Sequence, residues 1–171
     1  MTNGKQKGSG FERDVSRLLS LWWSDGANKN IFWRSVSSGA KATQMKKLGE
    51  LLNSQSGDIA LLSPITCKFI DDFYLELKFY KEFELTSNIM LPKSKNKLYR
   101  FWDDTIIQAN TYSKAPLLIF KSNRNPICVC YNIELNTIKN KLIIIRENKP
   151  PFNVANFTEF FDSLKQEKYP S

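Results

Sequence analysis

The sequence predicts an α/β fold in which a central mixed β-sheet is flanked by helices, and three observations support this prediction. Apolar residues recur at helical spacing over residues 10–23 and again over 98–109. Between these two segments lie short runs rich in apolar and aromatic residues, each bounded by turn residues as strands are. A further strand-like run follows the second helical segment. The predicted order is therefore helix, three strands, helix and strand, an αβββαβ core.

The first helix and the three strands occupy the first half of the chain. The apolar face of the helix expected over 10–23 is formed by Phe11, Val15, Leu18, Leu19 and Trp22. We expect the strands at 31–37, 58–62 and 73–78. Residues 41–52 are a basic insertion that can be helical, and residues 63–72 are expected to form a hairpin-like connection between the second and third strands.

The second half continues the same pattern after a stretch without a clear period. The second helix, over 98–109, should end before Pro116. We then expect two strands, a short strand and a terminal helix, at 116–121, 127–131, 142–145 and 157–164. The length fits a single domain over 1–171, in which residues 1–8 are flexible and residues 132–171 are a C-terminal extension of the core.

The composition favours a polyanionic partner. The chain has 171 residues, with 25 Lys and Arg against 17 Asp and Glu, which gives a formal charge of +8. Such a charge favours nucleic acid, although a membrane surface would also attract it. The start of the chain has no apolar signal segment, and the longest apolar runs are too short to span a bilayer. We therefore expect a soluble, cytoplasmic protein without a membrane partner.

The chain contains no histidine and three cysteines, Cys67, Cys128 and Cys130. Without histidine or a second cysteine pair, a tetrahedral zinc site lacks ligands, so we expect the cysteines to be reduced and structural. The lack of histidine also excludes Ser-His-Asp triads, Cys-His dyads and nucleases that use histidine as a general base. Carboxylates and lysines must carry any chemistry.

Suitable residues stand on the second and third predicted strands. Asp58 begins an apolar run, and in the next strand Leu75 and Leu77 alternate with Glu76 and Lys78. The Glu and Lys side chains therefore project from one face, about 7 Å apart. Carboxylates on neighbouring strands offer the hard oxygen ligands that Mg²⁺ prefers, while the lysine can steady a water nucleophile or a phosphate. The alternative is a solvated strand face, since Glu-x-Lys is a frequent pattern.

The pattern of Asp58 followed by Glu76-Leu77-Lys78 resembles the core of the PD-(D/E)XK nuclease superfamily, with Gly57 in place of the family's proline. The resemblance implies a restriction-endonuclease-like fold and hydrolysis of DNA with Mg²⁺ or Mn²⁺. It further implies that Asp58, Glu76 and the backbone carbonyl of Leu77 bind the metal and that Lys78 orients or deprotonates the attacking water.

Two branches of the superfamily share further features with this chain. Residues 8–13, together with the 58–78 core, look like the archaeal Holliday junction resolvases, which implies a catalytic Ser38 in the loop after the first strand. As an ordinary turn residue, Ser38 would have no such role. Gln108 and Tyr112 resemble the Gln-x-x-x-Tyr motif of RecB-like nucleases, which lies beside their active site. The same pair also fits an ordinary helix surface.

Glu12 has two competing interpretations. Ser9-Gly10-Phe11-Glu12 fits a Ser-x-x-Glu capping box, in which Glu12 would accept a hydrogen bond from the backbone N–H of Ser9. Many nucleases that resemble this chain instead carry a first-helix glutamate that joins the metal cluster. The sequence is compatible with either role.

Contacts to nucleic acid are expected from polar and basic residues near these motifs: Arg34, Ser37, Lys41, Lys46, Lys47 and Tyr112. Arg34 precedes the serine loop and fits either a phosphate contact or a solvated strand position. Residues 91–97 form a basic loop that either touches a phosphate backbone or is simply solvated.

The sequence therefore predicts a Mg²⁺- or Mn²⁺-dependent deoxyribonuclease. A structure-selective junction endonuclease, which would act as a homodimer, is one form of this prediction, and a RecB-like exonuclease or nickase is the other. The alternative from another class is a non-catalytic nucleic-acid-binding module on the same fold, and RNA is an alternative substrate. A short nuclease of this kind fits phage DNA processing, recombination or repair.

Overall fold

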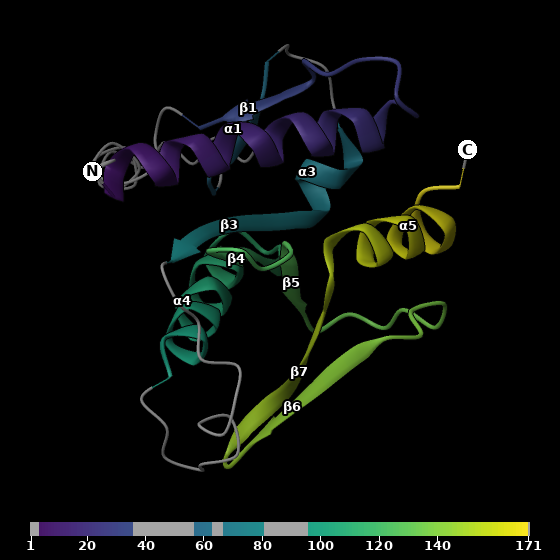
Figure 1. Cartoon of the computed structure of the whole chain (residues 1–171). Helices are drawn as coiled ribbons and strands as arrows, with labels where there is room; N and C mark the ends of the chain where they lie inside the picture. The colour runs from purple at the N-terminus through teal and green to yellow at the C-terminus, as the bar shows by residue number, and fades with distance from the viewer. Residues whose placement is uncertain (1–3, 36–56, 63–66, 81–95, 171) are drawn as a thin grey trace.

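A computed structural model describes residues 4–35, 57–62, 67–80 and 96–170 (Figure 1). The helices are α1 (Gly4–Trp23), α3 (Lys68–Asp72), α4 (Lys97–Thr111) and α5 (Phe157–Lys168). The strands are β1 (Phe32–Arg34), β2 (Ile59–Leu61), β3 (Phe73–Tyr80), β4 (Ala115–Ser122), β5 (Cys128–Tyr131), β6 (Lys141–Arg146) and β7 (Lys149–Asn156). Apart from the short helix α3 between β2 and β3, the series α1, β1, β2, β3, α4, β4 confirms the predicted αβββαβ order within the described part of the chain.

The central sheet is mixed, as predicted. Its strand order is β3-β4-β5-β7-β6, with β3 and β4 parallel and the other neighbours antiparallel. Parallel neighbours need a crossover connection, and α4 provides it between β3 and β4. β1 and β2 form a separate antiparallel ribbon. A single parallel bridge between Gly57 and Leu75 ties this ribbon to the free edge of β3.

Helices cover both faces of β3 (Figure 1). On one face α1, α3 and α5 enclose the larger apolar core, which includes Leu75 and Leu77 of β3. On the other face α4 covers a smaller core centred on Trp102 and Phe152. Side chains alternate along a strand, so Glu76 and Lys78 lie on the α4 face. This alternation sets the position of the charged residues, as the sequence predicted.

The first helix starts earlier than expected. α1 begins at Gly4, so residues 4–8, expected to be flexible, are helical. Lys5, Gln6 and Lys7 have good helix propensity, which is consistent with the earlier start. The capping-box interpretation of Glu12 is consequently wrong, because Ser9 lies inside α1 rather than at its N-cap.

The connection before β3 is not a hairpin. Residues 68–72 form the short helix α3, and the bridge between Gly57 and Leu75 is parallel. A hairpin would place the two segments antiparallel, so the expectation for 63–72 is wrong in the described residues 67–72. The parallel arrangement brings Asp58 alongside the middle of β3.

The strand β7 was not predicted, and its Pro150 and Pro151 are unusual in a strand. In the structure these prolines precede Asn153, where the pairing of β7 with β5 begins. Opposite them, the register between β6 and β7 shifts between Ile144 and Arg146. Prolines are tolerated at such an irregularity because fewer ladder hydrogen bonds are needed there.

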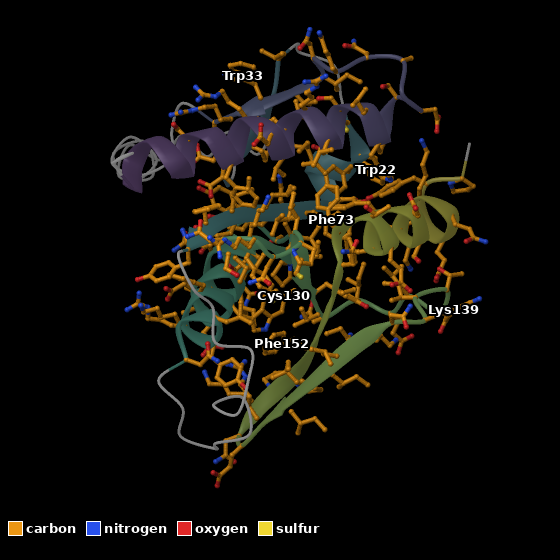
Figure 2. All side chains as sticks on the ribbon, viewed as in Figure 1. Trp22, Trp33, Phe73, Cys130, Lys139 and Phe152 are labelled. Carbon is orange, nitrogen blue, oxygen red and sulfur yellow. The ribbon has the colours of Figure 1, made fainter. Side chains whose placement is uncertain are left out.

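Among the tryptophans, Trp102 is buried, whereas Trp33 is 44% exposed. Trp33 follows the buried Phe32 on β1, so alternation turns its side chain outward. Figure 2 shows Trp33 at the periphery and Phe73 in the interior. Within the described part of the chain, no helix is long and apolar enough to cross a membrane.

Candidate active site

Asp58 is held against β3 by two hydrogen bonds. Its backbone N–H donates to the carbonyl of Leu75 at 2.9 Å, and its carboxylate Oδ2 accepts from the N–H of Leu77 at 2.8 Å. On the other side, the Asp58 carbonyl accepts from the N–H of Ser35 at 2.7 Å, which joins the end of β1 to the site. The Asp58 carboxylate is therefore fixed by the backbone on which Glu76 stands.

Gly57 explains the departure from the family's Pro-Asp pattern. Its φ is +88°, a value that proline cannot adopt because its ring fixes φ near −65°. A Cβ at this position would also collide with the carbonyl oxygen of Leu75 and lie 3.1 Å from its nitrogen. Only glycine fits this close approach of the two backbones.

Glu76 is held from two sides. Its Oε1 accepts a hydrogen bond from Lys78 Nζ, and its Oε2 accepts a longer one from the Tyr74 hydroxyl, at 3.4 Å. The Tyr74 ring stacks on Tyr112 with centroids 5.8 Å apart and planes at 19°. Tyr74 was not among the predicted site residues, although the alternation of Tyr74, Glu76 and Lys78 on one strand face was a signal that would have found it.

The site concentrates charge away from water. Burial raises the pKa of Asp58 to about 7, and repulsion from the Glu76 carboxylate adds to the shift, while the N–H of Leu77 and the charge of Lys78 oppose it. Burial tends to lower the pKa of Lys78, but its contacts with Glu76 and the charge of Asp58 raise the pKa overall. Lys78 therefore stays protonated at neutral pH.

Glu12 and Arg34 form an ion pair beside Asp58 and Glu76. Arg34 Nε lies 3.7 Å from Glu12 Oε2, and the two side chains are 35% and 20% exposed. The Glu12 charge contributes weakly to raising the pKa of Asp58. The structure thus places the α1 glutamate near Asp58, with an arginine beside it.

The donor set suits a hard divalent cation. Two carboxylates, of Asp58 and Glu76, flank the backbone of Leu77, and all of these donors are oxygens of the kind that Mg²⁺ and Mn²⁺ prefer. Burial is the main cause of the raised pKa of Asp58, and a bound cation would relieve the second cause, repulsion from the Glu76 carboxylate. In the described ranges, no three His, Cys, Asp or Glu side chains already stand together as a metal cluster.

The remaining predicted residues separate into two groups. On α4, Gln108 is exposed, whereas Tyr112, the C-cap residue, contacts Tyr74. Of the Gln-Tyr pair, Tyr112 is thus the member that reaches a neighbour of Glu76. The other predicted residues lie outside the described part of the chain: Ser37, Ser38, Lys41, Lys46 and Lys47.

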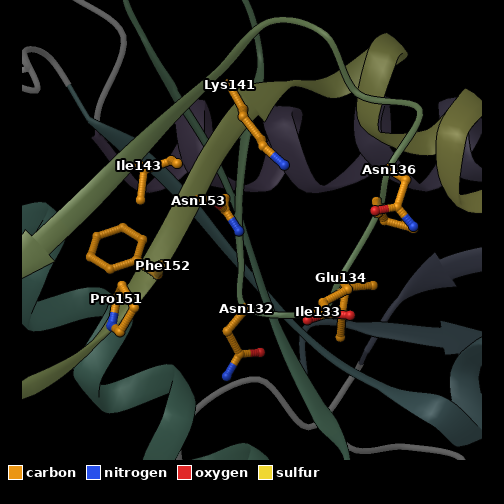
Figure 3. A pocket seen from close by; sticks show the side chains of 10 residues that line it. Asn132, Ile133, Glu134, Asn136, Lys141, Ile143, Pro151, Phe152 and Asn153 are labelled. Atoms are coloured by element: carbon orange, nitrogen blue, oxygen red, sulfur yellow. The ribbon is translucent and has the colours of Figure 1, made fainter.

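A pocket of about 380 Å³ lies elsewhere, between the segment after β5 and the β6–β7 hairpin (Figure 3). Its lining includes Asn132, Glu134, Lys141, Ile143 and Asn153. None of the predicted site residues lines it. Glu76 and Lys78 instead stand on β3, with Asp58 hydrogen-bonded to that strand, outside this pocket.

The fold and the placement of Asp58, Glu76 and Lys78 match what the PD-(D/E)XK nuclease class leads one to expect. A family model described as "Phage putative PDDEXK endonuclease" matches residues 3–169, so the chain belongs to this family. No curated protein and no solved structure matches the chain. The resemblance inferred from the motif is confirmed, and nucleic acid is the substrate class that a nuclease family implies.

Proposed function

We propose that this chain is a divalent-metal-dependent deoxyribonuclease that cuts phosphodiester bonds at the edge of β3. The observation that supports this most directly is the hydrogen bond from the Leu77 N–H to the Asp58 carboxylate. It places the acid of one strand beside the Glu76 and Lys78 pair of the next. Membership of an endonuclease family gives the reaction class, and the net charge of +8 suits a polyanionic substrate.

The proposed metal ligands are the carboxylates of Asp58 and Glu76 and the backbone carbonyl of Leu77, with Glu12 as a further carboxylate. When bound, the metal lowers the pKa of a water molecule and neutralises charge at the scissile phosphate. Lys78 is proposed to orient the attacking water and to stabilise negative charge on the phosphate. Its raised pKa favours this role over that of a base, because a protonated lysine donates and does not accept.

Two forms of this function differ in substrate. A homodimeric junction endonuclease is suggested by the resemblance of residues 8–13 to junction resolvases, with Ser38 as an added catalytic residue. A RecB-like nuclease that acts on ends or nicks is suggested by Tyr112, which stacks on the tyrosine that contacts Glu76. The position of Tyr112 favours the second form. In both, Arg34, Ser37, Lys41, Lys46 and Lys47 contact the DNA, and Gln108 assists Tyr112.

The test compares supercoiled plasmid, linear duplex, nicked duplex, four-way junction, single-stranded DNA and RNA with Mg²⁺, Mn²⁺ or EDTA. We expect metal-dependent cleavage of DNA that is lost in Asp58→Asn and Glu76→Gln. Asp162→Asn, an exposed change on α5, is the matched control. Full activity in both site variants would refute the assignment. Salt-sensitive binding without turnover at any metal concentration would instead support a non-catalytic module.

A further inference from the structure

A group of cations and aromatic rings continues the site along β3 towards the start of α4. We call Lys78, Tyr80, Lys97, Arg100 and Phe101 the basic–aromatic cluster. Lys78 Nζ and the Arg100 guanidinium lie 5.5 and 5.3 Å from the centroid of the same Phe101 ring. Lys97 Nζ lies 4.2 Å from the Tyr80 centroid and donates a hydrogen bond to the Tyr80 hydroxyl at 2.8 Å.

The two elements bring this cluster together through their periodicities. Lys78 and Tyr80 share one face of β3, and on α4 Arg100 and Phe101 follow Lys97 by three and four residues. The ring centroids of Tyr80 and Phe101 lie 6.2 Å apart, so β3 and α4 contact each other through these two rings. The rings are half-buried while Lys97 and Arg100 are exposed, so the cations face solvent on an ordered aromatic base.

The charge of this surface is positive. In the described structure neither Lys97 nor Arg100 forms an ion pair with a carboxylate. Two acidic residues of α4 lie nearby. Asp103 is paired with Arg146 and Lys149, and Asp104 is exposed and acts electrostatically on Lys78. The two exposed cations are therefore available to an anion.

We infer that the basic–aromatic cluster binds the phosphodiester backbone of the nucleic-acid strand beside the scissile phosphate. This inference rests on the proposed function. Lys78 and Arg100 contact the same Phe101 ring. A nucleic-acid strand whose phosphate lies at Lys78 therefore also runs close to Arg100. Cation–π contacts hold the charged groups in place, so less side-chain freedom is lost when phosphate binds. Lysine and arginine contacts to phosphates position a strand without reading its sequence.

The test is binding to labelled duplex and single-stranded DNA of several sequences, in EDTA so that no cleavage occurs, across a series of salt concentrations. For Lys97→Gln/Arg100→Gln we expect weaker binding, to a similar extent for every sequence. The slope of log affinity against log salt should fall by about 1.8 on duplex, or about 1.4 on single strands, for two lost phosphate contacts. With metal restored, KM should rise about 10-fold or more with kcat little changed, as for two phosphate contacts.

Two control variants test whether the effect depends on the charge of Lys97 and Arg100 and on their position in the molecule. Lys97→Arg/Arg100→Lys keeps both charges and should bind nearly as the wild type does. Lys139→Gln/Lys168→Gln removes two exposed charges near α5, on the side of the molecule away from α4 (Figures 1 and 2), and should leave the slope less affected. Asp104→Asn should strengthen binding, because it removes the negative charge beside Lys78.

An unchanged salt slope in Lys97→Gln/Arg100→Gln would overturn the inference on both DNA forms. An equal loss of binding in Lys97→Arg/Arg100→Lys with a lowered Tm would overturn it as well, since the cluster would then act through the fold. Failure of the proposed function would give a different result, namely no cleavage by the wild-type chain with metal. The salt slopes are measured in EDTA without turnover, so they test the cluster separately.

Discussion

The two edges of the sheet differ in what they expose. At the β3 edge, Asp58 and Glu76 are carboxylates drawn away from water, although burial of like charges costs free energy. At the β6 edge, Ile143 and Ile145 are apolar and yet 60% and 81% exposed. An exposed apolar side chain is common and nearly neutral in energy, whereas two half-buried carboxylates side by side need a reason. This difference favours β3 as the place of the chemistry, independently of the family.

The largest expected effect is at Gly57, which lets the β3 edge form. Gly57→Ala adds a Cβ that collides with the Leu75 backbone, at a φ that disfavours any side chain. We expect a loss of roughly 3 kcal/mol or more in unfolding free energy and loss of cleavage. Gly57→Pro, which restores the family's residue, should be at least as damaging because proline cannot reach this φ.

Denaturant unfolding and plasmid cleavage measure both changes at Gly57. Gly26→Ala is the matched control, since Gly26 has a φ of +85° with open space around its Cβ position. It should cost only the strain of positive φ, about 1 kcal/mol. Equal losses at the two glycines would show that the contact with Leu75 is unimportant.

The second effect concerns stability and pH. Because the pKa of Asp58 is raised to about 7 in the fold, the folded chain holds a proton that the unfolded chain releases at lower pH. The carboxylate therefore lowers the stability of the metal-free protein as pH rises from about 4 to 7, and this cost is complete above pH 7. Asp58→Asn should raise Tm more at pH 8 than at pH 5, while cleavage is lost.

Thermal unfolding in EDTA at the two pH values measures this gain. The wild type should recover stability with Mg²⁺ or Mn²⁺ through mass action, whereas Asp58→Asn should recover less. A lower Tm for Asp58→Asn than for the wild type at both pH values would contradict the expectation that the ionised Asp58 carboxylate destabilises the metal-free fold.

A smaller effect is expected at Tyr74, which contacts Glu76. Tyr74→Phe keeps the stack on Tyr112 but removes the hydroxyl that donates to Glu76 Oε2. We expect kcat to fall by about 10-fold or less, with stability nearly unchanged, in line with the loss of one long hydrogen bond. Tyr131→Phe is the control, because the buried Tyr131 hydroxyl has no hydrogen-bond partner in the described structure. Equal kcat in Tyr74→Phe and the wild type would remove Tyr74 from the site.

The smallest effect is expected at the β6 edge. Ile145→Thr keeps a β-branched residue on an 81% exposed position, so we expect a stability change within about 0.5 kcal/mol and unchanged cleavage. Its neighbour Ile144 is 5% exposed and packs against Phe152, so Ile144→Thr should cost about 2 kcal/mol or more. Chemical denaturation measures the unfolding free energy of both variants. A similar loss in Ile145→Thr and Ile144→Thr would mean that the β6 edge is covered in solution.

The sequence by itself determined the element order, the charged face of β3 and the class of chemistry. Helical and strand periods are local properties, so the predicted helix over 98–109 and the alternation around Glu76 are found in the structure. The absence of histidine is a property of composition, and it restricts the chemistry to carboxylates and lysines whatever the fold.

Only the tertiary structure decided how distant segments meet. The parallel bridge at Gly57, the hydrogen bond from Leu77 to Asp58 and the Arg34–Glu12 pair each join residues from different elements. The hydrophobic periodicity and the composition of the sequence carry no information on which distant backbone segments come into contact. That approach made a glycine necessary before Asp58, and through α3 it turned an expected hairpin into a parallel contact that completes the candidate site.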